Sequence, residues 1–228
     1  MRICVLVCGV AAWIGLCAST VEGTIVFGQR DTFVDSNGNP DVMGWIRGVN
    51  AITLPSVVPT GGPDGGTDPY LQNTSTGTTG SNSRMSMFNQ DQWTGDYLDA
   101  GVTLITADMA DFGTTPLYMR LAIEDDFGTE WGSTNSAFLP ADGKWHSLSF
   151  DMTASGLTLL QGTAPLSHSL ANVGILRMVS NQEGPNFRGD ILLGVMGVDN
   201  ITALPEPTVA PLVAALGAGL LRRRRRGS

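Results

Sequence analysis

The fold is decided by a stretch in the middle of the chain that reads LYMRLAIE over residues 117–124. Its odd-numbered positions carry large apolar side chains, and its even-numbered positions carry tyrosine, arginine, alanine and glutamate. Successive side chains of a β-strand point to opposite faces of the sheet. The stretch therefore predicts a strand with one face in a core and the other face towards solvent.

The same alternation recurs on both sides of this stretch. Leu148, Phe150 and Met152 alternate with serine and aspartate. Other short runs typical of strands occupy residues 43–49, 70–73, 85–88, 102–107, 173–179 and 191–203. Glycine and proline are dense between the runs, and no long stretch has a helical period with caps. We expect an all-β fold in which two antiparallel sheets form a jelly-roll sandwich, which length and long connections favour over an immunoglobulin-like sandwich.

The central region is acidic and free of cysteine. Of 13 Lys+Arg residues six lie near the ends, and of 21 Asp+Glu residues two do, so residues 24–205 hold seven cations against 19 anions, a net charge of −12. This charge argues against a nucleic-acid partner, because such binding rests on Lys and Arg at the phosphates. All three cysteines lie within residues 4–17, which excludes a disulfide framework or a cysteine nucleophile in the central region.

The N-terminal segment, residues 1–23, has the pattern of a secretory signal. Arg2 precedes an apolar run over residues 3–17, which is the length of a signal helix and short for a membrane span. Small or branched residues at Val21 and Gly23 predict cleavage after Gly23, with cleavage after Ser19 as the alternative. We therefore expect the central domain, residues 24–204, to be exported.

The C-terminal segment, residues 205–228, combines three features in a fixed order. A Pro-Glu-Pro motif is followed by an apolar run over residues 209–221 and by a block of arginines. The residues of the motif and of the block are Pro205, Glu206, Pro207, Arg222, Arg223, Arg224, Arg225 and Arg226. The run predicts a short hydrophobic helix that enters the inner membrane, and the arginines are expected to stay on the cytoplasmic side.

This three-part tail resembles the PEP-CTERM sorting signal of bacteria that produce exopolysaccharide. The resemblance implies an exosortase-type processing enzyme as a partner, which cuts near the Pro-Glu-Pro motif. It also implies transient anchoring in the inner membrane, followed by location at the cell surface or in the extracellular matrix.

Short motifs of the central domain resemble the galactose-binding-like jelly rolls, which include many carbohydrate-binding modules. They read DTF from residue 31, GW from 44, DPYL from 68, WHSLSFD from 145 and VDNI from 198. The resemblance implies a jelly roll and a structural Ca²⁺ between the opening segment and the closing strand. Onto this chain the metal set maps as Asp199, with Asp35 and Asp68 as partners. The alternative for Asp35, in a DSNGNPD segment, is a turn capped by its own side chains.

Four residues are candidates for binding polysaccharide. Trp93 and Trp131 lie in polar, glycine-containing segments, where an exposed indole can stack on a sugar ring. Tyr118 and Arg120 occupy the solvent-facing parity of the strand over residues 117–124. We expect these side chains to line a shallow glycan site.

The sequence gives little support for catalysis. Glu124, Asp126 and Glu130 are paired carboxylates of the kind glycosidases use, but residues 127–129 predict a turn that carries Glu130 away. The chain has two histidines and no GxSxG elbow. We therefore expect a non-enzyme that binds polysaccharide. The alternatives are a purely structural surface protein and a glycan-active hydrolase.

Overall fold

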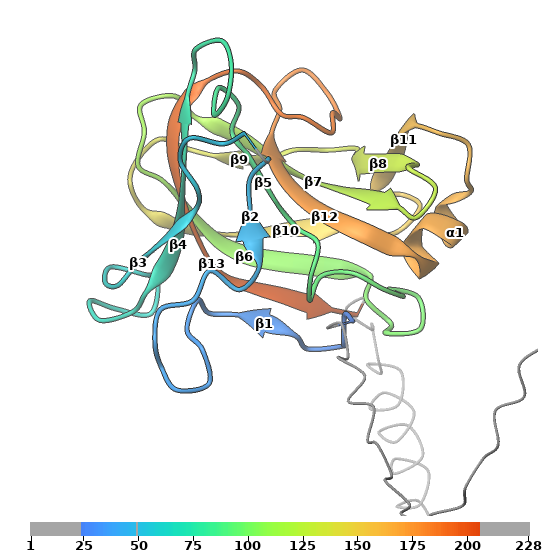
Figure 1. Ribbon diagram of the computed structural model, residues 1–228, viewed down its shortest axis with the longest axis horizontal. Helices are drawn as coiled ribbons and strands as arrows, with labels where there is room; N and C mark the ends of the chain where they lie inside the picture. The colour runs from blue at the N-terminus through green and yellow to red at the C-terminus, as the bar shows by residue number, and fades with distance from the viewer. Residues whose placement is uncertain (1–23, 49, 206–228) are drawn as a thin grey trace, which may run out of the picture.

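Two antiparallel β-sheets packed face to face make up the computed structural model, which describes residues 24–48 and 50–205 (Figure 1). The predicted signal segment, the apolar run and the arginine block lie outside the described residues. Pro205 ends the described chain and is exposed. Within the described ranges, no helix is long and apolar enough to cross a membrane.

The first sheet has six strands, and the closing strand of the chain lies inside it. Its order is β10 (Trp145–Asp151), β6 (Leu104–Asp111), β13 (Leu193–Leu204), β4 (Tyr70–Thr76) and β3 (Ser56–Val58), and β1 (Arg30–Asp31) also pairs with β13. The opening strand β1 thus lies beside the end of β13, so both ends of the described chain meet at one end of the sandwich (Figure 1).

The second sheet has seven strands and includes the alternating stretch over residues 117–124. Its order is β11 (Leu157–Gln161), β8 (Glu130–Ser133), β7 (Leu117–Asp125), β12 (Val173–Ser180), β5 (Ser86–Asn89) and β2 (Trp45–Ile46), and β9 (Ala137–Leu139) also pairs with β7. One short helix, α1 (Leu166–Ala171), precedes β12. The two-sheet antiparallel jelly-roll sandwich expected from the sequence is confirmed.

The alternation over residues 117–124 has the predicted outcome. Leu117, Met119, Leu121 and Ile123 are fully buried in the core between the sheets. The intervening residues point to the outer face of the seven-stranded sheet. This outer face, rather than the core, is where polar and aromatic side chains of β7, β12 and β5 are available for a ligand.

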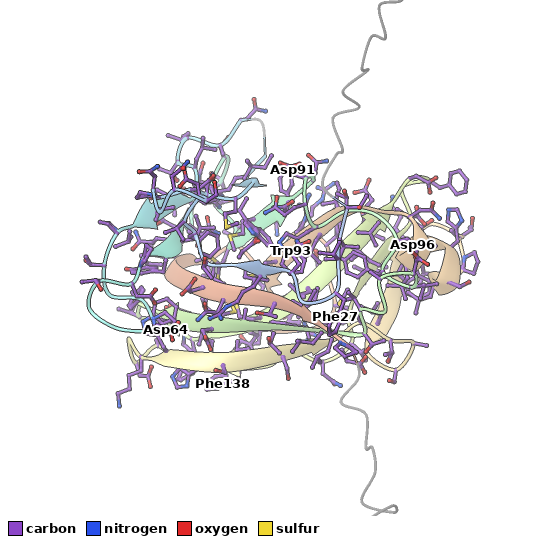
Figure 2. All side chains as sticks on the ribbon, turned by 90° about the horizontal axis from the view of Figure 1, so that it is seen from below. Phe27, Asp64, Asp91, Trp93, Asp96 and Phe138 are labelled. Atoms are coloured by element: carbon purple, nitrogen blue, oxygen red, sulfur yellow. The ribbon has the colours of Figure 1, made fainter. Side chains whose placement is uncertain are left out.

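A buried carboxylate joins the sheets at one end of the core. The Nε1–H groups of Trp45 and Trp93 both donate to Oδ2 of Asp31, each at 2.7 Å. The two indole rings are 6.4 Å apart, and both are buried. Figure 2 shows Trp93 within the body of the sandwich, whereas Asp64 and Phe138 lie at its periphery.

Trp93 is therefore not the exposed stacking residue that the sequence predicted. The polar segment that contains Trp93 turns the ring inward, because the carboxylate of Asp31 satisfies the indole N–H inside the protein. The expectation that Trp93 stacks on a sugar was wrong for this reason.

Candidate functional site

The outer face of the seven-stranded sheet is partly covered by the loop between β12 and β13, residues 181–192, called the covering loop below. Phe187 of this loop is buried with its ring 4.1 Å from the guanidinium carbon of Arg177 on β12. Asn181 and Gly189 each accept a hydrogen bond on the backbone oxygen, from Arg120 and Arg84. These contacts hold the loop against the sheet and leave a cavity on each side of it.

The larger cavity has a volume of about 760 Å³ and is lined by four arginines. We call it the arginine cavity. Its lining residues are Arg47, Gly48, Asn50, Ala51, Gly80, Ser81, Asn82, Ser83, Arg84, Ser86, Phe88, Arg177 and Arg188, and none of these described residues is acidic. Residues 24–205 contain seven Lys and Arg residues in all. More than half of the cations of an acidic domain therefore line one cavity.

Two of the four arginines lie next to the ends of β2 and β5. Arg47 follows β2, and Arg84 precedes β5. Arg47 is 6% exposed and donates to the backbone oxygens of Thr74 and Arg84. Burial lowers the pKa of the Arg47 guanidinium, yet an arginine side chain stays charged. Arg84 donates to the backbone oxygen of Gly189 in the covering loop. Both side chains are thus fixed by backbone carbonyls, with further N–H groups left for a ligand.

The other two arginines lie on the side of the covering loop. Arg177 is held between two rings, with its guanidinium carbon 4.9 Å from the centroid of Phe88 and 4.1 Å from that of Phe187. Burial lowers the pKa of Arg177, and the charges of Glu124 and Glu130 raise it in part. Arg188 is exposed, and its side chain forms no hydrogen bond with the described residues. Arg188 is therefore free to contact a ligand.

The smaller cavity, on the other side of the covering loop, has a volume of about 360 Å³ and contains Tyr118. Glu183 and Asp190 also line it, so its charge is opposite to that of the arginine cavity. The Tyr118 ring packs edge-on against the exposed ring of Phe138, at 5.4 Å between centroids. The structure thus places Tyr118 on the outer face, as the parity of the strand predicted.

The polar groups of Arg120 and Trp131 donate hydrogen bonds to neighbouring segments of the domain. Arg120 is 5% exposed and donates to the backbone oxygens of Asn181, Ser133 and Thr134. Trp131 is half-buried, and its Nε1–H donates to Oγ of Ser169 in α1 at 3.0 Å. The structure therefore separates the four predicted glycan residues: Tyr118 lines a cavity, Trp93 lies in the core, and Arg120 and Trp131 hold neighbouring segments in place.

The turn over residues 127–129 does not carry Glu130 away from Glu124, and that expectation was wrong. The two glutamates are directly opposite each other in the β7–β8 hairpin. Burial and the neighbouring charge of Glu124 raise the pKa of Glu130. A tight turn between two strands returns the chain to the same register, which the residue types of the turn alone did not reveal.

Asp199 on β13 is the carboxylate most suited to a cation. It is 1% exposed, and neither of its carboxylate oxygens has a hydrogen-bond partner. Burial raises the pKa of Asp199 to about 7 with the help of the charges of Asp68 and Asp64, against the opposing effects of the Asn200 N–H and of Arg30. A buried carboxylate without partners costs free energy that a bound cation removes.

Asp35 does not belong to this group. Its Oδ1 accepts hydrogen bonds from the backbone N–H groups of Asn37 and Asn39, each at 2.8 Å. These bonds, together with the side chain of Asn39, lower the pKa of Asp35. The alternative of a self-capped turn is what the structure shows. Asp64, which the sequence analysis did not single out, lies near Asp199 instead.

A second cluster of possible metal ligands lies where β7 ends beside α1. Ligand atoms of Asp125, Asp126 and His168 lie within 4.8 Å of one another. Asp125 already accepts bonds from the backbone N–H groups of Phe127 and Thr129 and from the hydroxyl of Ser169. His168 pairs with Asp126 at 2.9 Å. These partners account for the cluster without a metal.

No protein-family model matches this chain, and no curated protein sequence matches it. Among solved structures, an exo-β-agarase is similar at 13% identity and a TM-score of 0.49, over 79% of this chain and 25% of the agarase. The chain thus spans about a quarter of that protein's length.

Two carbohydrate-binding modules of cellulosomal cellulases from Clostridium thermocellum are also similar. The family 11 module has 15% identity and a TM-score of 0.46, over 79% of this chain and 95% of the module. The family 30 module has 12% identity and a TM-score of 0.41, over 80% of this chain and 93% of the module. The strand pairing of this chain, rather than these partial similarities, defines its fold.

Proposed function

We propose that this chain is an exported, non-catalytic surface or matrix protein that binds polysaccharide at the arginine cavity. The observation that carries the proposal is an open cavity of about 760 Å³ on the outer face of a rigid sheet. Its volume lies within the range of ligand sites in proteins. Ser81 and Ser83 add hydroxyl groups to the guanidinium donors, and Phe88 adds an apolar surface.

This combination suits a sugar chain. A sugar ring presents hydroxyls around its rim and C–H groups on its faces, so it needs several fixed hydrogen-bonding groups beside an apolar surface. Here three of the four arginines, Arg47, Arg84 and Arg177, are held by backbone carbonyls or by aromatic rings, so little conformational entropy is lost when they bind. The alternative, a structural surface protein without a specific ligand, would leave this arrangement without a role.

Blocking the arginine cavity is expected to lower polysaccharide binding at least about tenfold. Ser81 is exposed and lines the cavity, so Ser81→Leu places a branched aliphatic side chain where the sugar would lie without removing a charge. Binding of the full chain to a panel of immobilised neutral and acidic polysaccharides measures this loss. Tyr118→Ala, in the smaller cavity, is the matched comparison.

Tyr118→Ala is expected to change the same affinity less than about threefold. If Tyr118→Ala abolished binding while Ser81→Leu did not, the site would belong to the smaller cavity. Failure of every polysaccharide to bind would favour the purely structural alternative. Release of reducing sugar that disappears in Glu124→Gln would favour the hydrolase, for which the facing pair Glu124 and Glu130 is the candidate.

Export and sorting are part of the same proposal. The pattern of residues 1–23 supports secretion, and the tail from Pro205 supports processing by an exosortase-type enzyme after transient anchoring in the inner membrane. Mass measurement of the protein recovered from the cell surface tests this. A start at Thr24 and an end near Pro207 are expected, and intact chain in the cytosol would contradict the proposal.

We also propose that a structural Ca²⁺ binds at Asp199 and Asp68, with Asp64 nearby. Carboxylate oxygens are the ligands that calcium prefers, and the two unpartnered oxygens of Asp199 fit that preference. A bound cation would offset the mutual repulsion of the buried Asp199, the half-buried Asp68 and the exposed Asp64, and it would tie the loop that carries Asp64 and Asp68 to β13.

Calcium at about 100 times its dissociation constant is therefore expected to raise the free energy of unfolding by about 2.7 kcal/mol. Thermal melting with Ca²⁺ and with chelator measures the effect. Asp199→Asn should abolish the difference and should melt higher than the wild type in chelator, because it removes a buried charge without partners. Asp35→Asn is the control and should keep the calcium effect. Equal midpoints with and without Ca²⁺ in the wild type would contradict the metal site.

A further inference from the structure

We infer that the polysaccharide bound at the arginine cavity is acidic, and that the cavity recognises isolated carboxylate or sulfate groups spaced along a sugar chain. This inference rests on the proposed function and specifies its ligand. The cavity is positively charged. Its lining includes Arg47, Arg84, Arg177 and Arg188, and none of its described lining residues is acidic.

These four charges lack ion-pair partners among the described residues. The ion pairs within the described residues join Arg30 to Asp64, His146 to Asp142 and His168 to Asp126. None of them includes an arginine of the cavity. Glu124 and Glu130 act on Arg177 through space without forming an ion pair. A buried charge such as Arg47 is costly unless an opposite charge accompanies it, and an acidic ligand supplies that charge.

The N–H donors of the four arginines are only partly used by the described residues. Arg47 uses two N–H groups on backbone oxygens and Arg84 uses one, while Arg177 and Arg188 donate to none of the described residues. The Nε–H of Arg177 is buried and has no partner. Guanidinium groups bind carboxylate and sulfate-like oxygens through paired N–H donors. The cavity lining therefore includes guanidinium groups of Arg84, Arg177 and Arg188 with N–H donors that no described residue accepts.

The acid groups of the ligand should be widely spaced along the sugar chain, because the surface around the cavity is acidic. Outside the cavity the domain is strongly acidic, since residues 24–205 have a net charge of −12. The smaller cavity beside the covering loop includes Glu183 and Asp190. A densely charged polymer that extended from the arginine cavity over this smaller cavity would be repelled there. A sugar chain with spaced acid groups places one anion in the cavity and neutral rings over the acidic surroundings.

Isothermal titration calorimetry of the full chain with matched oligosaccharides tests the inference. The acidic probe is a gellan oligosaccharide, whose glucuronate carboxylates are widely spaced, and the neutral probe is the same oligosaccharide after reduction of its carboxyl groups to alcohols. A carrageenan oligosaccharide distinguishes sulfate from carboxylate. Carboxyl reduction is expected to lower affinity at least about tenfold.

Two variants locate the effect. Arg188→Gln removes an exposed charge that has no ion-pair partner among the described residues. It should lower affinity for the acidic probe about tenfold and affinity for the neutral probe less than about threefold. Lys144→Gln removes the same charge beside β10, on the other sheet, and should change neither affinity. Equal losses in both variants would show a general charge effect and overturn the assignment to the cavity.

The outcomes separate this inference from the proposed function. If the reduced oligosaccharide bound as well as the acidic one, the cavity would still bind polysaccharide but the acidic ligand would be wrong. If neither oligosaccharide nor any of the panel polysaccharides bound, both the ligand and the proposed function would fail. Binding of single-stranded DNA as tight as that of the acidic oligosaccharide, and equally reduced in Arg188→Gln, would assign the cavity to nucleic acid instead.

Discussion

Replacing Trp93 by alanine is expected to lower the free energy of unfolding by about 3–5 kcal/mol. The side chain is fully buried, packs near Trp45 and donates to Asp31 at 2.7 Å. Its loss leaves a cavity at one end of the sandwich and removes one of the donors that satisfy a buried carboxylate. Denaturant unfolding followed by circular dichroism measures the change.

A smaller change at Trp93 separates packing from hydrogen bonding. Trp93→Phe keeps a ring in the core but loses the bond to Asp31, so a loss of about 1–2 kcal/mol is expected. Both variants should bind polysaccharide normally while they remain folded. If Trp93→Ala kept its stability but lost polysaccharide binding, the placement of this ring in the core would be wrong.

The second large effect is expected at Asp31, whose carboxylate accepts both indole N–H groups. Asp31→Ala leaves two buried donors without an acceptor, which is expected to cost about 2–4 kcal/mol. Asp31→Asn retains an acceptor oxygen and should cost less. Unfolding midpoints of the two variants, compared with that of the wild type, measure the difference.

Asp31 also makes stability depend on pH. Burial raises the pKa of Asp31 above its ordinary value, and the indole bonds offset this only in part. Between the ordinary carboxyl pKa and the raised pKa, the folded state binds more protons than the unfolded state does. The contribution of Asp31 to the free energy of unfolding therefore falls as pH rises through this window and stays constant above it. Asp31→Asn should remove that slope, and an unchanged slope would assign it to other carboxylates.

The sheets could be predicted because their signal is local. The alternation over residues 117–124 and around Phe150 reflects the burial of one face, which each strand records in its own sequence. The short strands β1, β3, β8, β9 and β11 and the helix α1 were not predicted. Each has six residues or fewer, which is too short for its own pattern to show its state, so contacts with other segments determine it.

The candidate site could not be predicted in the same way. Arg47, Arg84, Arg177 and Arg188 come from separate parts of the chain, and no spacing in the sequence links them. The low number of cations in residues 24–205 was visible, but their gathering in one cavity was not. The exposure of Trp93 was predicted wrongly because its neighbours in sequence are polar. The acceptor of its N–H, Asp31, lies 62 positions away and could not be recognised from the sequence.

An amide NMR titration of the full chain with the gellan oligosaccharide locates the binding surface. The largest shift changes are expected on residues 80–88 and on Arg177 and Arg188, around the arginine cavity, while β6 and β10 on the other sheet are unchanged. Shift changes centred on β6 and β10, or none at saturating oligosaccharide, would show that the arginine cavity does not bind acidic polysaccharide.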